Sequence, residues 1–174
     1  SQSEEAMVRE KEAKIATLAV SAVILIIYAF DVDVAKYGIF AGAGVGQRVV
    51  YHFFHSSFLH AVLNAWCLLS VVFVFDVSLS LFITAFFAAS LFPVDTLYHL
   101  MPLSSLEVPT VGLSGVCYAL MGMMAFRVQR KLYYQAWLAF YIGLGFLFPN
   151  VNGWIHLYCY VVGLIIGYLN KPIK

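Results

Sequence analysis

A serine, two histidines and an asparagine are the residues of this chain best suited to chemistry, because they lie in or beside long apolar runs. Ser114 belongs to a Gly-Leu-Ser-Gly motif at residues 112–115, and His156 follows 42 positions later. His60 and Asn64 are four residues apart, which places them on one face of a helix. A hydroxyl, an imidazole and a pair of hydrogen-bond donors are the groups needed for acyl transfer.

In such a reaction His156 would act as the general base and take the proton of Ser114 as the serine attacks a carbonyl. The attacked oxygen would become negatively charged. Side-chain donors from His60 and Asn64, together with the backbone N–H of Ser114, would stabilise that charge. A position at the start of a helix adds a favourable dipole for an oxyanion.

The neighbours of the serine fit the same chemistry. Gly112 and Gly115 would let a substrate backbone approach closely. Tyr118 lies one turn after the serine on the same helix face, where it would stack on the imidazole of His156. No carboxylate is placed to orient that imidazole, because Asp76 falls at the other end of its apolar run. We therefore predict a Ser–His dyad rather than a triad.

The composition requires the elements around these residues to be membrane helices. Hydrophobic residues make up 63% of the 174 and charged residues 11%, whereas soluble domains are near one half and one quarter. At this length we predict a single all-α membrane domain. The net charge of +1 gives no basic surface for nucleic acid. The three cysteines fall within apolar runs, which favours buried packing over disulfides.

We predict six spans, at residues 15–30, 58–75, 77–92, 112–126, 133–148 and 154–169. The fourth, which carries Ser114, has 15 residues before Arg127. As a helix it is roughly 22 Å long, against a hydrocarbon core of about 30 Å. If Arg127 marks one membrane face, Ser114 must lie inside the membrane thickness. The sequence therefore predicts a short central helix that carries the serine.

The segments outside the spans have distinct characters. Residues 1–14 are charged and predict a solvated helical lead-in, whereas residues 15–170 form the six-helix core. Residues 31–56 are too apolar for a water-facing loop and too rich in glycine for a span, so we expect them to lie in the membrane interface. In the polar connection 94–111, Ser104 and Glu107 have the spacing of a capping box. Residues 171–174 are a short tail.

The distribution of Lys and Arg predicts the orientation. With six spans, one side carries Arg9, Lys11, Lys14, Arg127, Arg130, Lys131, Lys171 and Lys174. The other side carries only Lys36 and Arg48. The positive-inside rule then places both termini in the cytoplasm of a cell (inner) membrane. The fourth and sixth spans both begin on the outer side, so Ser114 and His156 should lie at similar depth in a hydrophilic cavity open to the outside.

Other interpretations account for some of the same residues. A serine in a span also serves close helix packing, as Gly163 and Gly167 would. The chain has the histidines of a metal site, at positions 52, 55, 60, 99 and 156. It has no His-Glu-x-x-His motif, however, so we predict no metal. A transporter would use the polar residues as a pathway, but they gather on the outer half and no internal repeat links the two halves.

Taken together, the motifs resemble those of the rhomboid intramembrane serine proteases, and most closely the bacterial six-span type. The resemblance covers residues 48–167. It rests on His55-x4-His60-x3-Asn64, on the run Gly112-Leu113-Ser114-Gly115-Val116-x-Tyr118-Ala119-Leu120-Met121-Gly122, and on His156 followed by Gly163 and Gly167.

This resemblance implies cleavage of single-span membrane proteins in or near their transmembrane segment, without a metal or organic cofactor. It implies that Ser114 is the nucleophile and His156 the base. It further implies that Arg48 belongs to an interfacial first loop and that Asp76 ties this loop to the core. The fifth span would act as a lateral gate. A non-catalytic binder of transmembrane segments with the same fold is the alternative.

Several positions depart from the family pattern. Gln47 stands where a tryptophan is usual, and Val111 where a glycine is common. Trp154 and Ile155 replace small residues before the histidine, and Cys159 replaces a glycine. The last three changes fall around the predicted packing of the fourth and sixth spans, where we expect shifts in cavity shape or rate.

Overall fold

The computed structural model describes residues 1–149 and 151–172. The end of the predicted tail, at 173–174, and position 150 in the turn before the last predicted span lie outside the described residues. Within these limits the chain is helical, with one isolated antiparallel bridge between Ile39 and Thr110.

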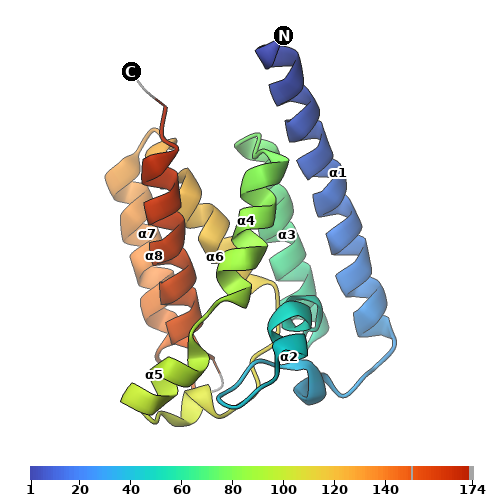
Figure 1. Cartoon of the computed structure of the whole chain (residues 1–174), viewed down its shortest axis with the longest axis vertical. Helices are drawn as coiled ribbons and strands as arrows, with labels where there is room; N and C mark the ends of the chain where they lie inside the picture. Colours follow the sequence, from blue (N-terminus) through green and yellow to red (C-terminus); the bar gives the residue numbers. More distant parts are fainter. Residues whose placement is uncertain (150, 173–174) are drawn as a thin grey trace.

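Six helices make up the bundle: α1 (Gln2–Ala29), α3 (Phe58–Val74), α4 (Leu79–Ser90), α6 (Ser114–Met123), α7 (Lys131–Gly145) and α8 (Gly153–Leu169). Figure 1 shows both termini at one end of the molecule, with the loop after α1 at the other. The predicted spans agree with these helices within a few residues, except that α1 continues through the charged lead-in to Gln2.

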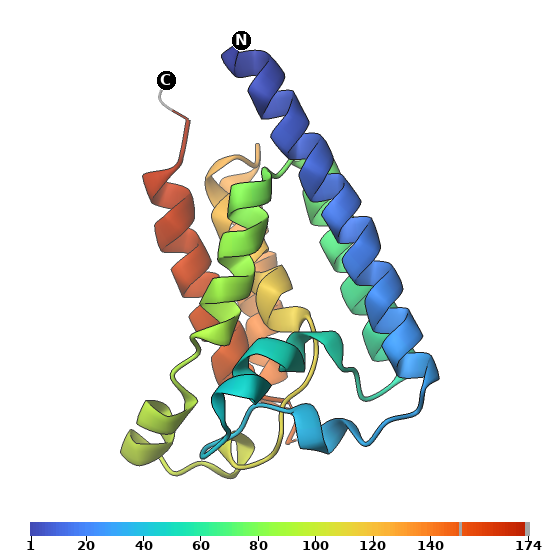
Figure 2. The same ribbon diagram turned by 45° about the vertical axis from the view of Figure 1, so that its right-hand side comes forward.

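The short elements cluster at the end opposite the termini. They are η1 (Val34–Tyr37), α2 (Val45–Val50), η2 (Tyr51–Phe53), α5 (Val94–Leu100) and η3 (Ser104–Leu106), and Figure 2 shows them below the bundle. The predicted capping box at Ser104 is wrong. Ser104 begins a 3-10 turn without a side-chain cap, and Glu107 instead accepts a hydrogen bond from the Tyr98 hydroxyl.

The number of spans does not follow from helix length. Among the described residues, two segments are long and apolar enough to cross a membrane, Gln2–Ala29 and Leu79–Leu100. A third would be Val45–Phe53 joined to Phe58–Val74, which is bent by 86°. A core of about 30 Å needs about 20 helical residues, and α6 and α8 are shorter. The six-span arrangement therefore remains a prediction.

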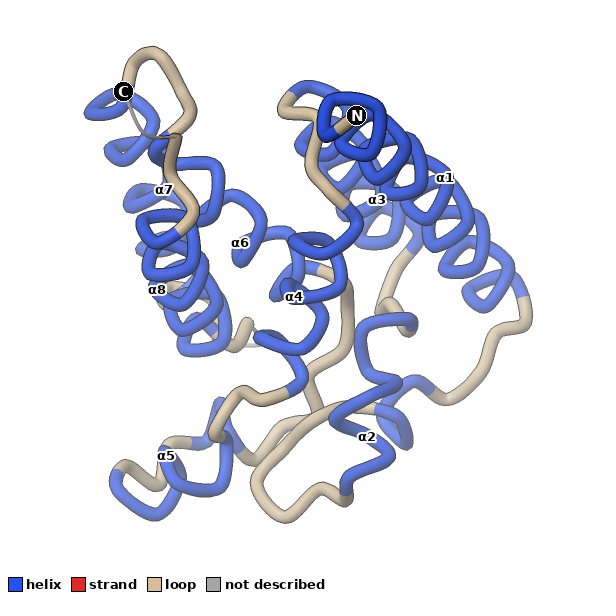
Figure 3. Tube along the Cα trace, turned by 45° about the horizontal axis from the view of Figure 1, so that its top comes forward, coloured by secondary structure: helices blue, strands red, loops and turns tan. Residues whose placement is uncertain are grey.

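Helix α6 lies at the centre, between α7 and α8 on one side and α1 and α3 on the other (Figure 3). A 3-10 turn, η4 (Met124–Phe126), extends it. Glycines allow α8 to pack against its backbone. A Cβ at Gly122 would lie closer than 3.0 Å to the backbone of α8, and a Cβ at Gly163 or Gly167 would meet the backbone of α6 in the same way. This contact sets the position of α8 relative to α6.

Candidate active site

Ser114 is the first residue of α6, and the backbone just before it is held by the loop of residues 31–56. Gly112 has a φ of +122°, which disfavours any residue with a side chain. Its N–H donates to the carbonyl of Tyr51 at 2.9 Å. The N–H of Leu113 donates to Nε2 of the buried His55 at 3.2 Å. These bonds fix the direction in which the chain enters α6.

The structure brings Ser114 and His156 together. The serine Oγ lies 2.9 Å from Nε2 of His156, which is in the first turn of α8. The ring of Tyr118 stacks on the imidazole, with centroids 4.6 Å apart and an interplanar angle of 30°. A Cβ built on Gly145 would lie 3.5 Å from Nδ1, so α7 closes that side. In the described part of the chain, no carboxylate bonds to His156.

His60 and Asn64 are brought to the other side of the serine loop. A Cβ on Gly112 would lie 2.7 Å from Cε1 of His60 and 3.4 Å from Nδ2 of Asn64, so both side chains border this glycine. The backbone N–H of Ser56 donates to Nδ1 of His60 at 3.3 Å. An Nδ1 that accepts a proton donor leaves the proton of a neutral imidazole on Nε2. His60 therefore directs an N–H toward Gly112.

Asn64 has a buried Nδ2 for which the described residues supply no hydrogen-bond acceptor. A buried amide without a partner is costly and is uncommon in folded proteins. Since this nitrogen faces the backbone that precedes Ser114, it is available to a group bound at the serine. The first N–H groups of α6 are available as well, because no side chain caps this helix.

Gly115 belongs to the helix contacts rather than to the open side of the serine. A Cβ at this position would lie 3.3 Å from both the Ala89 methyl group and Cys159 Sγ. It allows α6 to approach α4 and α8 closely. The cysteine that replaces a family glycine thus lies against Gly115, one turn after His156.

The role predicted for Asp76 is wrong. Its carboxylate pairs with Lys14 of α1 at 2.6 Å, because Asp76 follows the end of α3 that lies far from the loop of residues 31–56. Asp95 holds the loop instead. It pairs with Arg48 at 2.8 Å and accepts the N–H of Gly42 at 2.7 Å. Arg48 also donates to the Phe92 carbonyl at 2.7 Å, so the arginine does belong to a loop that is tied to the core.

Sequence reasoning assigned no role to Asp95, Thr110 or Asn152. Asp95 follows Pro93 in a segment without apolar periodicity, so its α5 helix was missed. Asn152 stands directly before the last apolar run, which is a usual place for an N-cap. The side chain of Asn152 does accept the N–H of Ile155, at 3.3 Å. This signal was present in the sequence.

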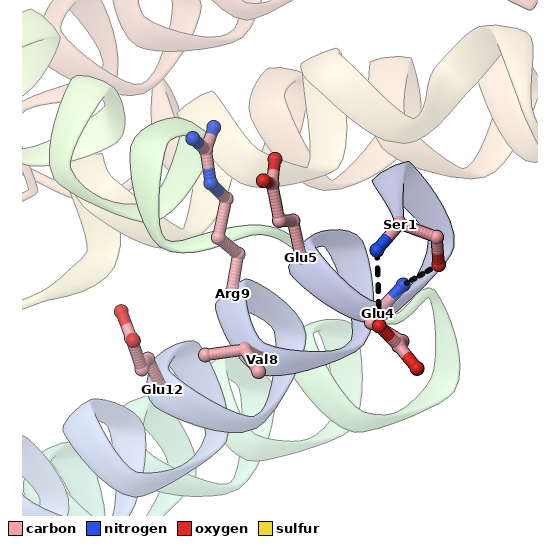
Figure 4. A pocket seen from close by; sticks show the side chains of 6 residues that line it. All are labelled: Ser1, Glu4, Glu5, Val8, Arg9 and Glu12. Atoms are coloured by element: carbon pink, nitrogen blue, oxygen red, sulfur yellow. Dashed lines mark hydrogen bonds and ion pairs between the residues drawn. The ribbon is translucent and has the colours of Figure 1, made fainter.

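A surface hollow lies away from these residues, along the first turns of α1 (Figure 4). It is lined by Ser1, Glu4, Glu5, Val8, Arg9 and Glu12. The amino group and hydroxyl of Ser1 both bond to Glu4, which makes the capping box of α1. This hollow is therefore the surface of a capped helix end, and the residues suited to acyl transfer lie elsewhere.

A known protein family matches most of this chain. No curated protein matches the chain. The family of the Rhomboid domain matches residues 43–172, which include the loop with Arg48 and every helix from α2 to α8. This match covers most of the chain and all the residues described around Ser114. The chain therefore belongs to the rhomboid family.

Proposed function

We propose that this chain is an intramembrane serine endopeptidase that cleaves single-span membrane proteins in or near their transmembrane segment. The observation that carries the proposal is the 2.9 Å contact between Ser114 Oγ and His156 Nε2, close to the Asn64 Nδ2 donor, for which the described residues supply no acceptor. Membership of the rhomboid family supports it, since this is a family of intramembrane proteases.

The first step is attack by Ser114 on the scissile carbonyl, while Nε2 of His156 takes the hydroxyl proton. The tetrahedral oxyanion is stabilised by Nε2–H of His60, Nδ2 of Asn64 and the backbone N–H of Ser114. The imidazolium then protonates the leaving amine. An acyl-enzyme remains, and a water activated by His156 hydrolyses it. Tyr118 keeps the imidazole in plane by stacking throughout.

Water must reach this dyad for the second half of the reaction. Ser114, His60 and His156 are partly exposed, whereas Asn64 is buried. We infer a hydrophilic cavity that opens on the side where the loop of residues 31–56 lies. Both termini lie at the opposite end (Figure 1). With the termini in the cytoplasm, as the distribution of Lys and Arg indicates, the site faces the extracytoplasmic side of a cell membrane.

The test uses the whole chain in liposomes with a single-span substrate that carries helix-breaking residues near its outer end. A serine-directed fluorophosphonate probe is added in parallel. We expect Ser114→Ala to abolish labelling and His156→Ala to lower cleavage by at least about 10³-fold. Ser70→Ala, the same change in α3 far from His60, should retain both signals.

Each alternative outcome has a meaning. Labelling without cleavage would indicate a competent dyad tested with the wrong substrate. If folded wild-type protein gives neither signal, the endopeptidase proposal fails. A rhomboid-fold binder of transmembrane segments would then be the better account, and its binding should survive Ser114→Ala.

A further inference from the structure

Asn152 uses both ends of its buried side-chain amide. Its Oδ1 accepts the N–H of Ile155 at 3.3 Å and so caps α8, the helix that carries His156. Its Nδ2 donates to Oγ1 of Thr110 at 3.4 Å. Thr110 lies on the segment that leads to Ser114. The amide therefore joins the start of one helix to the approach of another.

This contact has the same sequence separation as the dyad. Thr110 and Asn152 are 42 positions apart, and so are Ser114 and His156. Thr110 precedes Ser114 by four residues, and Asn152 precedes His156 by four residues. The Asn152–Thr110 contact is thus a second link between the two segments that meet at the dyad. The threonine end is anchored, because the backbones of Thr110 and Ile39 exchange two hydrogen bonds of 2.9 Å.

The direction of the imidazole depends on such indirect contacts. Among the described residues, His156 donates no hydrogen bond to a carboxylate, and its ring is held by stacking on Tyr118. His156 is also in the first turn of α8, so its distance from Ser114 depends on where that helix begins. Asn152 caps this start of α8 and bonds, through Thr110, to the segment that leads to the serine.

We propose that Asn152 is a positioning residue, which acts through Thr110 and the start of α8 to set the distance between His156 and Ser114. This rests on the proposed function only in that the distance governs proton transfer from the serine. A misplacement of about 1 Å can lower a catalysed rate about 10²-fold. Loss of the link should therefore reduce kcat and leave KM nearly unchanged, because the buried Asn152 side chain acts on the reaction through the position of His156.

The experiment separates the two ends of the link. Thr110→Val removes the hydroxyl acceptor and keeps the shape, and Thr110→Ser keeps the hydroxyl. Asn152→Ser keeps an oxygen that can cap α8 but is too short to reach Thr110. Asn170→Ser is the matched control, because the Asn170 side chain donates to the Ile166 carbonyl, one turn earlier at the far end of α8. Each variant is measured for kcat, KM, thermal stability and the rate of fluorophosphonate labelling.

We expect Thr110→Val and Asn152→Ser to lower kcat and the labelling rate about 10-fold, with KM within about twofold of wild type. The double variant should be no more than about twofold slower than the slower single variant, since both changes break one link. Thr110→Ser and Asn170→Ser should stay within about threefold of wild type. Multiplied effects in the double variant, or equal losses in Thr110→Val and Thr110→Ser, would overturn the proposal.

Crystal structures of wild type and Thr110→Val decide the question even if the protein neither cleaves nor labels. In that case the proposed function fails, but the positioning role is still measured. A Ser114–His156 separation that increases from hydrogen-bond distance to beyond about 3.5 Å in the variant supports the role of Asn152. An unchanged separation overturns it.

Discussion

Helices α7 and α8 are both neighbours of α6, but they are attached in different ways. At the α8 contact, glycines bring two backbones together, and a Cβ at Gly122, Gly163 or Gly167 would collide with main-chain atoms. Helix α7, in contrast, is attached to both α6 and α8 through side-chain hydrogen bonds. The Tyr134 hydroxyl donates to the Met121 carbonyl at 2.5 Å, and the Tyr160 hydroxyl of α8 donates to Gln135 of α7 at 2.5 Å.

The difference separates a fixed part of the molecule from one that can move. Two helices in backbone contact cannot slide past each other without steric collision. Two hydroxyl hydrogen bonds and the contacts of a row of aromatic rings can instead be broken one at a time. The two tyrosine bonds lie in the first half of α7, near Lys131. The second half carries exposed aromatic residues at Phe140 and Tyr141, and the exposed Phe146 follows its last residue. We therefore expect α8 to stay in place with His156 while the far end of α7 moves.

The largest expected effect is that of Gly163→Val. Its side chain would meet the Ala119 carbonyl and separate α6 from α8. We expect a loss of about 3 kcal/mol or more in the free energy of unfolding, together with loss of cleavage. Thermal and denaturant unfolding in detergent would measure the first. Gly143→Val is the control on α7, because a Cβ there has nothing within 4 Å. Equal losses in the two variants would contradict the comparison.

The next effect is that of removing both tyrosine hydroxyls of the α7 attachment. Each of Tyr134→Phe and Tyr160→Phe should cost about 1 kcal/mol, and the double variant about 2 kcal/mol. The rate of fluorophosphonate labelling should stay within about twofold of wild type, since the two hydroxyl bonds lie in the half of α7 that is far from His156 and the glycine contact holds α8 against α6. A double variant that labels 10-fold more slowly would show that α7 positions His156 after all.

A smaller effect is expected where α7 meets the start of α8. The rings of Phe146 and Trp154 pack edge to face with centroids 5.1 Å apart. Phe146→Leu keeps an apolar side chain but loses this pair, at a cost of about 1 kcal/mol. We expect faster cleavage of a membrane substrate at unchanged labelling by the small probe. A fall in the cleavage rate would be evidence against an opening at this end of α7.

The smallest effect, and the only stabilising one, is that of Gly143→Ala. A methyl group has room at this exposed helical position, and alanine favours a helix over glycine by up to about 1 kcal/mol. Cleavage should slow slightly if bending of α7 around Gly143 assists substrate access. Gly163→Ala provides the contrast, because the same change on α8 should destabilise the protein.

The helices could be predicted from the sequence because their boundaries are local. Apolar runs, Pro93 and Arg127 set the ends of most bundle helices to within a few residues of the structure. The helix α5 was missed because seven residues are too few to show a period. The length of a helix also does not decide whether it crosses a membrane, so the count of six spans stays a prediction.

Part of the candidate site could be predicted from the sequence. Ser114, His156, His60 and Asn64 are polar residues at unusual places in apolar runs, which is a signal that the sequence itself carries. The residues that hold the surrounding segments in place could not be predicted, because Asp95 and Thr110 make contacts between segments far apart in the chain. Asp76 was misassigned for the same reason. Its partner Lys14 lies 62 positions away, and nothing in the sequence indicates that pairing.

The glycine contact between α6 and α8 has a consequence for the continuity of the chain. Forty-two positions separate the two members of the dyad, yet the contacts that bring them together do not pass through the turn at residues 127–130. That turn connects η4 to α7 and takes no part in the contact between α6 and α8. Two separately expressed fragments, 1–128 and 129–174, should therefore assemble in one membrane into a functional whole, with the second inserting as a helical hairpin. Co-purification and restored labelling of Ser114 would reveal it.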